Sequence, residues 1–473
     1  MRPQLPKGFQ DLLPEDAIAR NSIIEKIRRV VESFGFLPIE TPSLEYLAAL
    51  IGTGGDDANK QIFKLKSPEH EDIALRFDLT VPFARFFSQY RDQLRLPFRR
   101  YHVALAWRAD KPDPGRFREF TQFDFDAAGS ASVALDAEII RVLCDVMAVL
   151  GVPEYIVLVN HRRILDAILE VCGIAEAGKR KHVLRVVDKL QKIGIEEVRK
   201  ELGPGRVDES GDPVKGVGID PESIHFIERL LNVTGESRAA VLDGIQSVLP
   251  DTEQCREALS ETQNFLNALE SLDVDEDHVK FTPNLARGLD YYTGPVFETI
   301  LREAPQFGSI MGGGRYDGLV RRFLGIDIPA TGASIGIDRL LAALKQIGAL
   351  TPIKTMTRVL VTVMRQDHLP YCLSIATELR RSGINTEVYF GNPDDGLGTQ
   401  LAMANRLGIP VAIIVGEEEL KSGNVAVKDL RAGIARRKHV TDREKYVAAG
   451  KAGQVTVRRA DCVRTVQQIL ASF

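Results

Sequence analysis

Cysteine and tryptophan are scarce in this chain of 473 residues, which has five cysteines and one tryptophan. The cysteines are scattered, odd in number and never spaced as Cys-x-x-Cys, which excludes a disulfide framework and a cysteine zinc site. The eight histidines show no His-x-His or His-x-x-x-His spacing, so we expect no protein-bound zinc. Reduced thiols of this kind are typical of a cytoplasmic protein.

Long apolar runs are also missing. Runs such as residues 411–415 are as short as a β-strand and far too short to cross a membrane. The first residues, MRPQLPKGFQDLLPEDA, lack the basic and then apolar pattern of a secretion signal. We therefore expect a soluble protein with no membrane partner.

A surplus of basic charge is absent, because 61 basic residues stand against 65 acidic ones, a net charge of −4. Contact with a nucleic acid would therefore depend on local clusters. One cluster is the segment 179–200, with eight basic and three acidic residues. The other contains Lys428, Arg431, Arg436, Arg437 and Lys438, opposed by Asp429. The alternative interpretation is that both are solvated faces.

Hydrophobic spacing predicts a helix over residues 14–34, with acidic residues at its start and Gly35 at its end. The stretch FLPIETPSLE follows, and its two prolines indicate an edge strand or an interface segment. Short apolar or alternating runs at 73–77, 101–107 and 122–127 predict strands of a mostly antiparallel sheet.

The middle and the end of the chain have different patterns. Residues 173–260 predict a mainly helical insertion, with GPGRVDESGDPVKG (203–216) as a loop. From residue 357, strands and helices alternate, which predicts a small α/β unit with a largely parallel sheet. We expect a catalytic domain in two parts, residues 1–172 and 261–346, around the insertion. A linker (347–357) and a C-terminal domain with its tail (358–473) follow.

Arginines surround the stretch WRADKPDPGRFREF, residues 107–120. Guanidinium groups of Arg108 and Arg116 suit phosphate oxygens, and Phe120 is suited to stack on a planar base. An exposed charged hairpin is the alternative.

Other polar residues suit a small charged ligand. Asp78 and Thr80 could accept hydrogen bonds from an ammonium group, or they could cap a helix. Gln122, Asp124 and Asp126 share one face of a predicted strand, as either a solvated face or the floor of a polar pocket. The glycines of MGGGRYDGLV (311–320) allow close backbone approach but lack the spacing of a dinucleotide site.

In this order, these motifs resemble class II aminoacyl-tRNA synthetases, and specifically the histidyl-tRNA synthetase family. FGFLPIETP resembles the dimer-interface motif, YHVALAWRADKPDPGRFREFTQFDFD the second class motif, and GIDRL (336–340) the third. LARGLDYYTGPVFE (285–298) is similar to the histidine-recognition signature of this family. The resemblance implies an α+β catalytic domain on a mixed, mainly antiparallel sheet with a helical insertion, and then a small α/β anticodon-binding-like domain.

The resemblance also implies roles for single residues. Arg108 would hold the ATP α-phosphate and Arg116 the distal phosphates, while Phe120 and Arg339 would enclose the adenine. Arg287, with Arg108, would be catalytic, at the point where the histidine carboxylate meets the α-phosphate. The histidine site as a whole would comprise Asp78, Leu79, Thr80, Arg108, Gln122, Asp126, Arg287, Tyr291, Tyr292 and Tyr316. Asp78, Thr80 and Gln122 would bind the α-amino group, and Asp126, Tyr292 and Tyr316 would surround the imidazole.

The implied function is ligation of L-histidine to tRNA(His) by a cytoplasmic homodimer, with ATP and Mg²⁺ as a substrate complex and no permanently bound cofactor. An alternative is a catalytically silent relative that serves as a regulatory subunit in histidine biosynthesis or as an amino-acid or tRNA sensor. Such relatives generally lose the C-terminal domain, the RGLDYY stretch or the motif arginines, and this chain has all of them.

Overall fold

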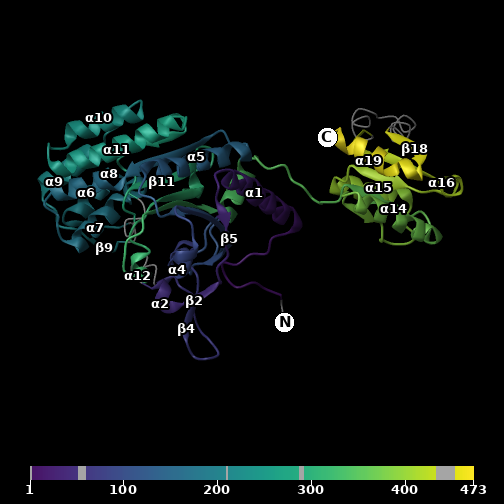
Figure 1. The fold of residues 1–473 in the computed structure, drawn as a ribbon, viewed down its shortest axis with the longest axis horizontal. Helices are drawn as coiled ribbons and strands as arrows, with labels where there is room; N and C mark the ends of the chain where they lie inside the picture. Colours follow the sequence, from purple (N-terminus) through teal and green to yellow (C-terminus); the bar gives the residue numbers. More distant parts are fainter. Residues whose placement is uncertain (1–2, 52–59, 209–210, 287–291, 433–452, 473) are drawn as a thin grey trace. The chain divides into compact units, whose positions relative to one another are not determined.

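The computed structural model describes residues 3–51, 60–208, 211–286, 292–432 and 453–472 (Figure 1). These residues form two compact units. The first comprises the chain up to Asp11 together with Arg20–Leu350, and the second comprises Leu12–Ala19 together with Thr351 onward. Each unit has a β-sheet of its own.

An eight-stranded sheet organises the first unit. Its order is β1-β5-β6-β13-β12-β11-β7-β10, and the five inner pairings are antiparallel while the two outer ones are parallel. This confirms the expected mixed, mainly antiparallel sheet. The strands are β1 (Leu37–Pro38), β5 (Phe98–Trp107), β6 (Glu119–Ala128), β7 (Tyr155–His161), β10 (Val279–Phe281), β11 (Pro295–Leu301), β12 (Met311–Arg315) and β13 (Ala330–Gly336).

The two faces of this sheet differ in polarity. Phe123 and Phe125 point to one face, where Phe36 meets Phe125 edge to face with ring centroids 5.6 Å apart. Helix α5 (Val133–Leu150) covers this face, and its buried Asp136 pairs with Arg315 of β12. Helix α1 (Pro14–Ser33) adds Glu32, which accepts a hydrogen bond from the Tyr101 hydroxyl at 2.6 Å. The other face holds the alternating polar residues of β6.

The proline-bearing stretch after α1 forms β1, an edge strand, as one of the two sequence interpretations predicted. A second, three-stranded sheet of order β2-β4-β3 lies near α2, α4 and α12 in Figure 1. These elements are β2 (Leu44–Tyr46), α2 (Leu47–Leu50), β3 (Lys64–Lys66), β4 (Asp72–Leu75), α4 (Thr80–Tyr90) and α12 (Arg321–Leu324).

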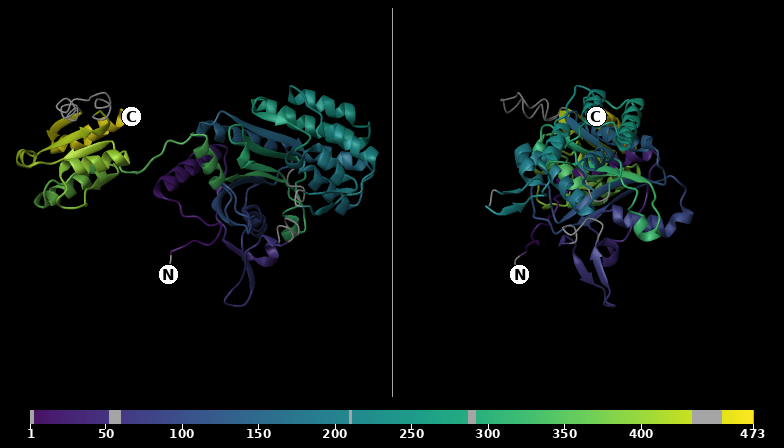
Figure 2. Two further views of the ribbon diagram at one scale, coloured as in Figure 1. Left: turned by 180° about the vertical axis from the view of Figure 1, so that it is seen from behind. Right: turned by 90° about the vertical axis from the view of Figure 1, so that its left-hand side faces the viewer.

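Helices dominate the segment expected to be an insertion, and they gather at one side of this unit (Figures 1 and 2). The expected segment contains α7 (Ala177–Val187), α8 (Leu190–Leu202), α9 (Pro221–Leu231), α10 (Arg238–Val248) and the start of α11 (Glu253–Ser271). Helix α6 (Arg162–Val171) precedes it and joins the same group. The prediction of a loop at 203–216 was wrong, because β8 (Gly205–Val207) and β9 (Pro213–Lys215) pair as a hairpin. The expected border at residue 260 lies inside α11, which packs on α5 and α6.

A five-stranded sheet of order β15-β14-β16-β17-β18 organises the second unit. Its first two pairings are parallel and its last two antiparallel, so the expectation of a largely parallel sheet holds for only half of it. The strands are β14 (Val359–Val361), β15 (Thr386–Val388), β16 (Val411–Ile414), β17 (Asn424–Asp429) and β18 (Gln454–Arg458). The helices are α14 (Leu369–Arg381), α15 (Leu397–Leu407), α16 (Glu417–Ser422) and α19 (Cys462–Ala471).

The tail beyond residue 440, which the sequence patterns left without a role, contributes β18 and α19. Cys462 and Val466 of α19 are buried in the same hydrophobic core as β14, β16 and α14. None of the helices in the described part of the chain is long and apolar enough to cross a membrane.

Candidate functional site

A cavity of about 290 Å³ opens on the polar face of the eight-stranded sheet. Its walls come from β6, β12, β13, the loop between β5 and β6, and the first residues of α4 and α13 (Ile337–Gln346). Eight of the residues predicted for the site line it: Asp78, Thr80, Arg108, Arg116, Phe120, Gln122, Tyr292 and Arg339. The structure therefore brings together residues that lie up to 261 positions apart in the sequence.

The remaining predicted residues are placed differently. Leu79, Asp126 and Tyr316 are buried and do not line the cavity. Arg287 and Tyr291 lie outside the described residues. Their assignment therefore stays a prediction from the family resemblance.

Arg108 and Phe120 face each other across the mouth of the β5–β6 hairpin. The Arg108 guanidinium carbon is 5.3 Å from the centroid of the Phe120 ring, and Nε donates to the Phe77 carbonyl at 2.8 Å. The guanidinium thus lies over an aromatic ring, and its bond to the carbonyl fixes its direction. A planar, cationic wall of this kind suits a phosphate beside a planar base.

Arg339 forms the opposite wall from the start of α13. Its Nη1 donates to the Ser309 carbonyl at 2.7 Å. Gly115 of the hairpin loop has a φ of +69°, and a Cβ there would lie 3.3 Å from the Arg339 Cα and from the Phe307 ring. Glycine therefore allows the loop to approach α13 closely. The loop therefore contacts the protein at Gly115, while Lys111, Asp113, Pro114 and Arg116 are exposed.

Asp338 and the N-terminal segment hold the β5–β6 loop and α13 together through hydrogen bonds. The sequence patterns had assigned no role to either. Asp338 Oδ2 accepts from the Thr121 backbone N–H at 2.5 Å, and Oδ1 accepts from Gln10 Nε2 at 3.4 Å. Gly8 accepts at its carbonyl from the Arg118 N–H at 2.8 Å. The segment around Gly8 and Gln10 therefore connects the hairpin loop with α13.

Asp78 caps a helix, which was one of the two sequence interpretations, and it also lines the cavity. Its Oδ1 accepts from the Val81 N–H at 3.1 Å, which caps α4, and its side chain also lines the cavity. Burial raises the pKa of this carboxyl, and the helix N–H and the nearby Arg108 and Arg100 partly oppose that rise. A cationic group that entered the cavity would favour the ionised form.

Alternating side chains of β6 form the floor behind the cavity. Residues 121–128 are all buried, so this polar face is not solvated, and Gln122 lines the cavity while Asp124 and Asp126 lie behind it. Gln122 Nε2 donates to Ser334 Oγ at 2.6 Å, while its Oε1 has no hydrogen-bond partner among the described residues. A buried acceptor without a partner is suited to a donor on a ligand.

Asp126 lies deeper, between Tyr316 and Arg100. The Tyr316 hydroxyl donates to Asp126 Oδ1, and Arg100 Nη2 is 2.6 Å from Oδ2. Gly332 on β13 leaves the room for this carboxylate, since a Cβ there would lie 2.1 Å from Oδ1. Arg100 was missed at the sequence level. The available signal was its place in the strand predicted at 101–107, one residue outside the bounds drawn from the pattern.

Asp124 and His102 are neighbours across β6 and β5, and both are buried. Burial raises the pKa of Asp124 to about 7; Arg100 opposes this rise and Asp126 adds to it. Burial also lowers the pKa of His102 to about 3, with the charges of Arg100 and Arg76 acting in the same direction. His102 is therefore neutral at pH 7, and the Asp124 carboxyl titrates close to neutrality.

We expect Asp124→Asn to change how stability depends on pH. In the native state Asp124 keeps its proton up to about pH 7, whereas in the unfolded state it loses it near a pKa of about 3.9. Between these two pKa values the native state binds one more proton than the unfolded state. The free energy of unfolding therefore falls as the pH rises from about 4 to about 7. Asparagine cannot ionise and abolishes the loss.

The measurement is urea unfolding of both proteins at pH 5.5 and pH 8. The free energy of unfolding of the variant relative to the original chain should be higher at pH 8 than at pH 5.5. A relative stability that is equal at the two pH values would show that Asp124 does not titrate in this range.

No group of three or more histidine, cysteine, aspartate or glutamate side chains that could hold a metal ion occurs in the ranges that the structure describes. The five cysteines are all free thiols. The site is thus built from arginine, carboxylate, amide and hydroxyl groups.

Comparison with known proteins identifies the family. A family model described as histidyl-tRNA synthetase matches residues 8–340, and one described as an anticodon binding domain matches residues 358–450. The histidine–tRNA ligase of Rhizobium meliloti (strain 1021) is 40% identical over 488 residues, which cover 100% of this chain and 96% of that protein. That of Cereibacter sphaeroides is 39% identical over 497 residues, covering 99% and 98%.

Solved structures give the same result for the fold. A histidyl-tRNA synthetase from Nostoc sp. PCC 7120 matches with a TM-score of 0.81 and 29% identity, covering 99% of both chains. A protein described as an ATP phosphoribosyltransferase regulatory subunit/histidyl-tRNA synthetase from Bacillus halodurans C matches with a TM-score of 0.68 and 24% identity, covering 85% of this chain and 96% of that one. The second likeness concerns the fold alone.

Proposed function

The chain belongs to the histidyl-tRNA synthetase family, and from this premise we propose how its residues carry out the reaction. Its function is that of a histidine–tRNA ligase, an aminoacyl-tRNA ligase that forms histidyl-adenylate and then histidyl-tRNA. The regulatory or sensory alternative is not favoured, because relatives that match over the full length are ligases. The observation that supports a working active site is the cavity that joins Arg108, Arg116 and Arg339 to an acidic and amide floor.

Adenylation joins two anions, so it needs neutralisation of charge more than it needs a base. The histidine carboxylate is ionised at pH 7, and one of its oxygens attacks the α-phosphorus of ATP while the bond to pyrophosphate breaks. Arg108 neutralises the α-phosphate in this proposal, and Arg116 holds the distal phosphates. Phe120 and Arg339 enclose the adenine. Mg²⁺, which comes with ATP, supplies further positive charge on the phosphates.

Arg287 completes the proposed catalytic pair, on the strength of the family resemblance. Tyr291 belongs to the same signature and is proposed to line the histidine site. Tyr292, the next residue in the chain, lines the cavity, so the middle of the signature reaches the site.

Histidine would lie along β6, with its ammonium group near Asp78, Thr80 and Gln122. Asp126 and the Tyr292 hydroxyl would meet the imidazole. A neutral imidazole has one donor and one acceptor nitrogen, so a carboxylate and a hydroxyl donor together distinguish it from rings that lack either nitrogen. The support for this arrangement is that Gln122 and Asp126 share the polar face of one strand.

The direct test of the function is ATP–pyrophosphate exchange with each of the twenty amino acids. Only histidine should support exchange. Exchange with a different amino acid would overturn the assignment of the substrate, and a lack of exchange with all of them would support the silent alternative.

Asp126→Asn should weaken histidine binding by about tenfold or more and leave the KM for ATP within about twofold, because one buried charged acceptor is lost. The matched control is Asp136→Asn, which alters another buried aspartate paired with an arginine, at 2.7 Å, on the other face of the sheet. The measurement is the KM for each substrate in exchange. Equal changes in both KM values would mean that Asp126 has only a structural role.

We propose a homodimer with the segment around β1 and β2 in its interface. Leu37, Leu44 and Tyr46 are 58%, 43% and 57% exposed, and β1 is an edge strand with no strand paired on its outer side among the described residues. Exposed apolar side chains beside an open edge favour a symmetric contact. Light scattering at micromolar concentration should give twice the mass of one chain, and the mass of a single chain would contradict the proposal.

The tRNA partner is proposed from the family and from the second unit, whose match is an anticodon binding domain. Of the basic cluster at 179–200, four members are engaged in ion pairs: Arg180 with Asp166, Lys189 with Glu201, Arg199 with Glu228, and Lys200 with Glu197. Exposed Lys192 is the member that we propose for phosphate contacts there. We propose the cytoplasm as the compartment in which this tRNA is charged.

A further inference from the structure

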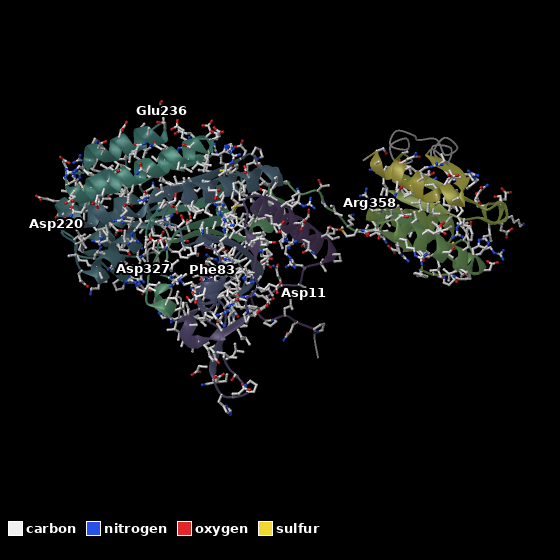
Figure 3. All side chains as sticks on the ribbon, in the orientation of Figure 1. Asp11, Phe83, Asp220, Glu236, Asp327 and Arg358 are labelled. Atoms are coloured by element: carbon white, nitrogen blue, oxygen red, sulfur yellow. The ribbon has the colours of Figure 1, made fainter. Side chains whose placement is uncertain are left out.

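Arg100 is a fully buried cation, with 0% of its surface exposed, on the polar face of β5 directly opposite Asp126. Its Nη2 lies 2.6 Å from Asp126 Oδ2 and donates to the Leu79 carbonyl at 3.2 Å. Its guanidinium carbon is 4.5 Å from the centroid of the Phe83 ring on α4. Phe83, labelled in Figure 3, is itself buried.

These contacts connect two parts of the site that come from different elements. Asp126 belongs to β6 and is proposed to meet the imidazole. Leu79 lies between Asp78 and Thr80, which line the cavity where the ammonium group is proposed to bind. One guanidinium thus holds the carboxylate at one end of the substrate and the turn at its other end.

Stability alone does not account for such a residue. Burying a guanidinium and a carboxylate costs desolvation free energy that their attraction often does not repay, and apolar replacements of similar volume are frequently neutral. The surroundings also contain the buried carboxyl group of Asp124. Arg100 therefore supplies the positive charge that this acidic floor needs, at a defined position.

We propose that Arg100 is a positioning residue that determines histidine specificity by fixing the Asp78–Thr80 turn and the Asp126 carboxylate at one separation. The inference rests on the proposed function. The planar guanidinium reaches both groups in a fixed geometry, whereas a lysine ammonium is a compact point charge on a flexible stem. A positive charge alone is thus insufficient to position the two groups, and the planar shape of the guanidinium is required.

The experiment compares Arg100→Lys and Arg100→Met with the original full-length chain in histidine-dependent ATP–pyrophosphate exchange. Arg100→Lys should raise the KM for histidine by about tenfold, and Arg100→Met by about 10²-fold, because one and then both connections are lost. The KM for ATP should change less than about twofold, and kcat less than about threefold, because Arg100 does not reach the phosphate wall. The ratio of kcat/KM for histidine over 1-methylhistidine should fall in both variants.

Arg238 offers matched controls elsewhere in the same unit. It is also buried, at 6% exposed, its Nε is 3.2 Å from Glu276 Oε1, and its Nη2 donates to the Val274 carbonyl at 3.0 Å. Its contacts are thus of the same kind, one carboxylate and one backbone carbonyl, away from the cavity. Arg238→Lys and Arg238→Met should leave the KM for histidine unchanged, whatever they do to thermal unfolding.

Three results would overturn the inference. One is a histidine KM in Arg100→Lys equal to that of the original chain, and another is equal effects in the Arg100 and Arg238 variants. The third concerns the double variant Arg100→Met/Asp126→Asn, which should be no worse than the more damaging single change; strictly additive losses would show that Arg100 does not act through Asp126.

These results remain separate from a failure of the proposed function. If the original chain neither binds histidine in calorimetry nor supports exchange, the proposed function and this inference fall together. If the original chain is active and only the Arg100 predictions fail, the function stands and the inference falls. Should Arg100→Met not fold, Arg100→Lys, which keeps the charge, carries the test.

Discussion

Replacing Arg108 with alanine is expected to lower histidine-dependent ATP–pyrophosphate exchange by about 10²–10³-fold, because one preorganised donor to a developing charge is typically worth that much. The guanidinium is held before the substrates arrive, by the Phe77 carbonyl at 2.8 Å and by the Phe120 ring. Little reorganisation is therefore needed when charge develops on the α-phosphate. The loss should appear mainly in kcat, since the charge is greatest in the transition state.

The matched control is Arg99→Ala, one residue before Arg100 on β5. Arg99 points to the other face of the sheet, where it pairs with Glu138 at 2.5 Å and donates to the Phe34 carbonyl at 2.9 Å. Exchange should survive this change to within a few-fold. Full exchange activity in Arg108→Ala would remove Arg108 from the catalytic pair and would leave the reaction to other groups of the cavity.

Removal of residues 356–473 should abolish efficient charging of tRNA but leave histidine-dependent exchange. All strands of the eight-stranded sheet come from residues 37–336, and all strands of the five-stranded sheet come from residues 359–458. The truncation therefore breaks no pairing between strands. The cavity is lined entirely by residues up to Arg339. The activating half of the reaction is thus separable in the structure from the unit that matches an anticodon binding domain.

Two assays check this prediction on one preparation: exchange with histidine, and transfer of labelled histidine to tRNA. Thermal unfolding monitored by circular dichroism verifies that the shortened chain is folded. Loss of exchange in a truncated chain that still folds would show that the second unit is needed for the activation of histidine. Normal charging of tRNA would exclude the second unit from tRNA recognition.

Strand pairings explain which features of the site could be predicted from the sequence and which could not. The alternation of Gln122, Asp124 and Asp126 showed that they share a face, because period two is a local property of a strand. Whether that face is exposed to solvent or buried depends on α4 and β13. These elements are distant from β6 in the sequence, so local patterns could not decide the question. The role of Arg100 was hidden for the same reason, since its partner Asp126 is identified only by the register between β5 and β6.

Local rules failed where tertiary packing overrode them. Gly, Pro and Asp between 203 and 216 predicted a loop, yet β8 and β9 form an antiparallel pair within that stretch. The last strand and helix were not found, since short segments such as β18 become strands only through a partner, here β17. Motif order, by contrast, located the cavity residues well, because side-chain chemistry there limits which residues can be used.

The place of β18 and α19 in the chain has a consequence for biosynthesis. Val466 is fully buried in the core of the second unit, against strands made more than fifty residues earlier, such as β14 and β16. During translation, domains fold as units and the N-terminal ones fold first. The first unit can therefore fold and form its active site while translation continues. The second unit cannot complete its core until α19 has emerged from the ribosome. A nascent chain of this ligase becomes competent to activate histidine before it becomes competent to recognise tRNA.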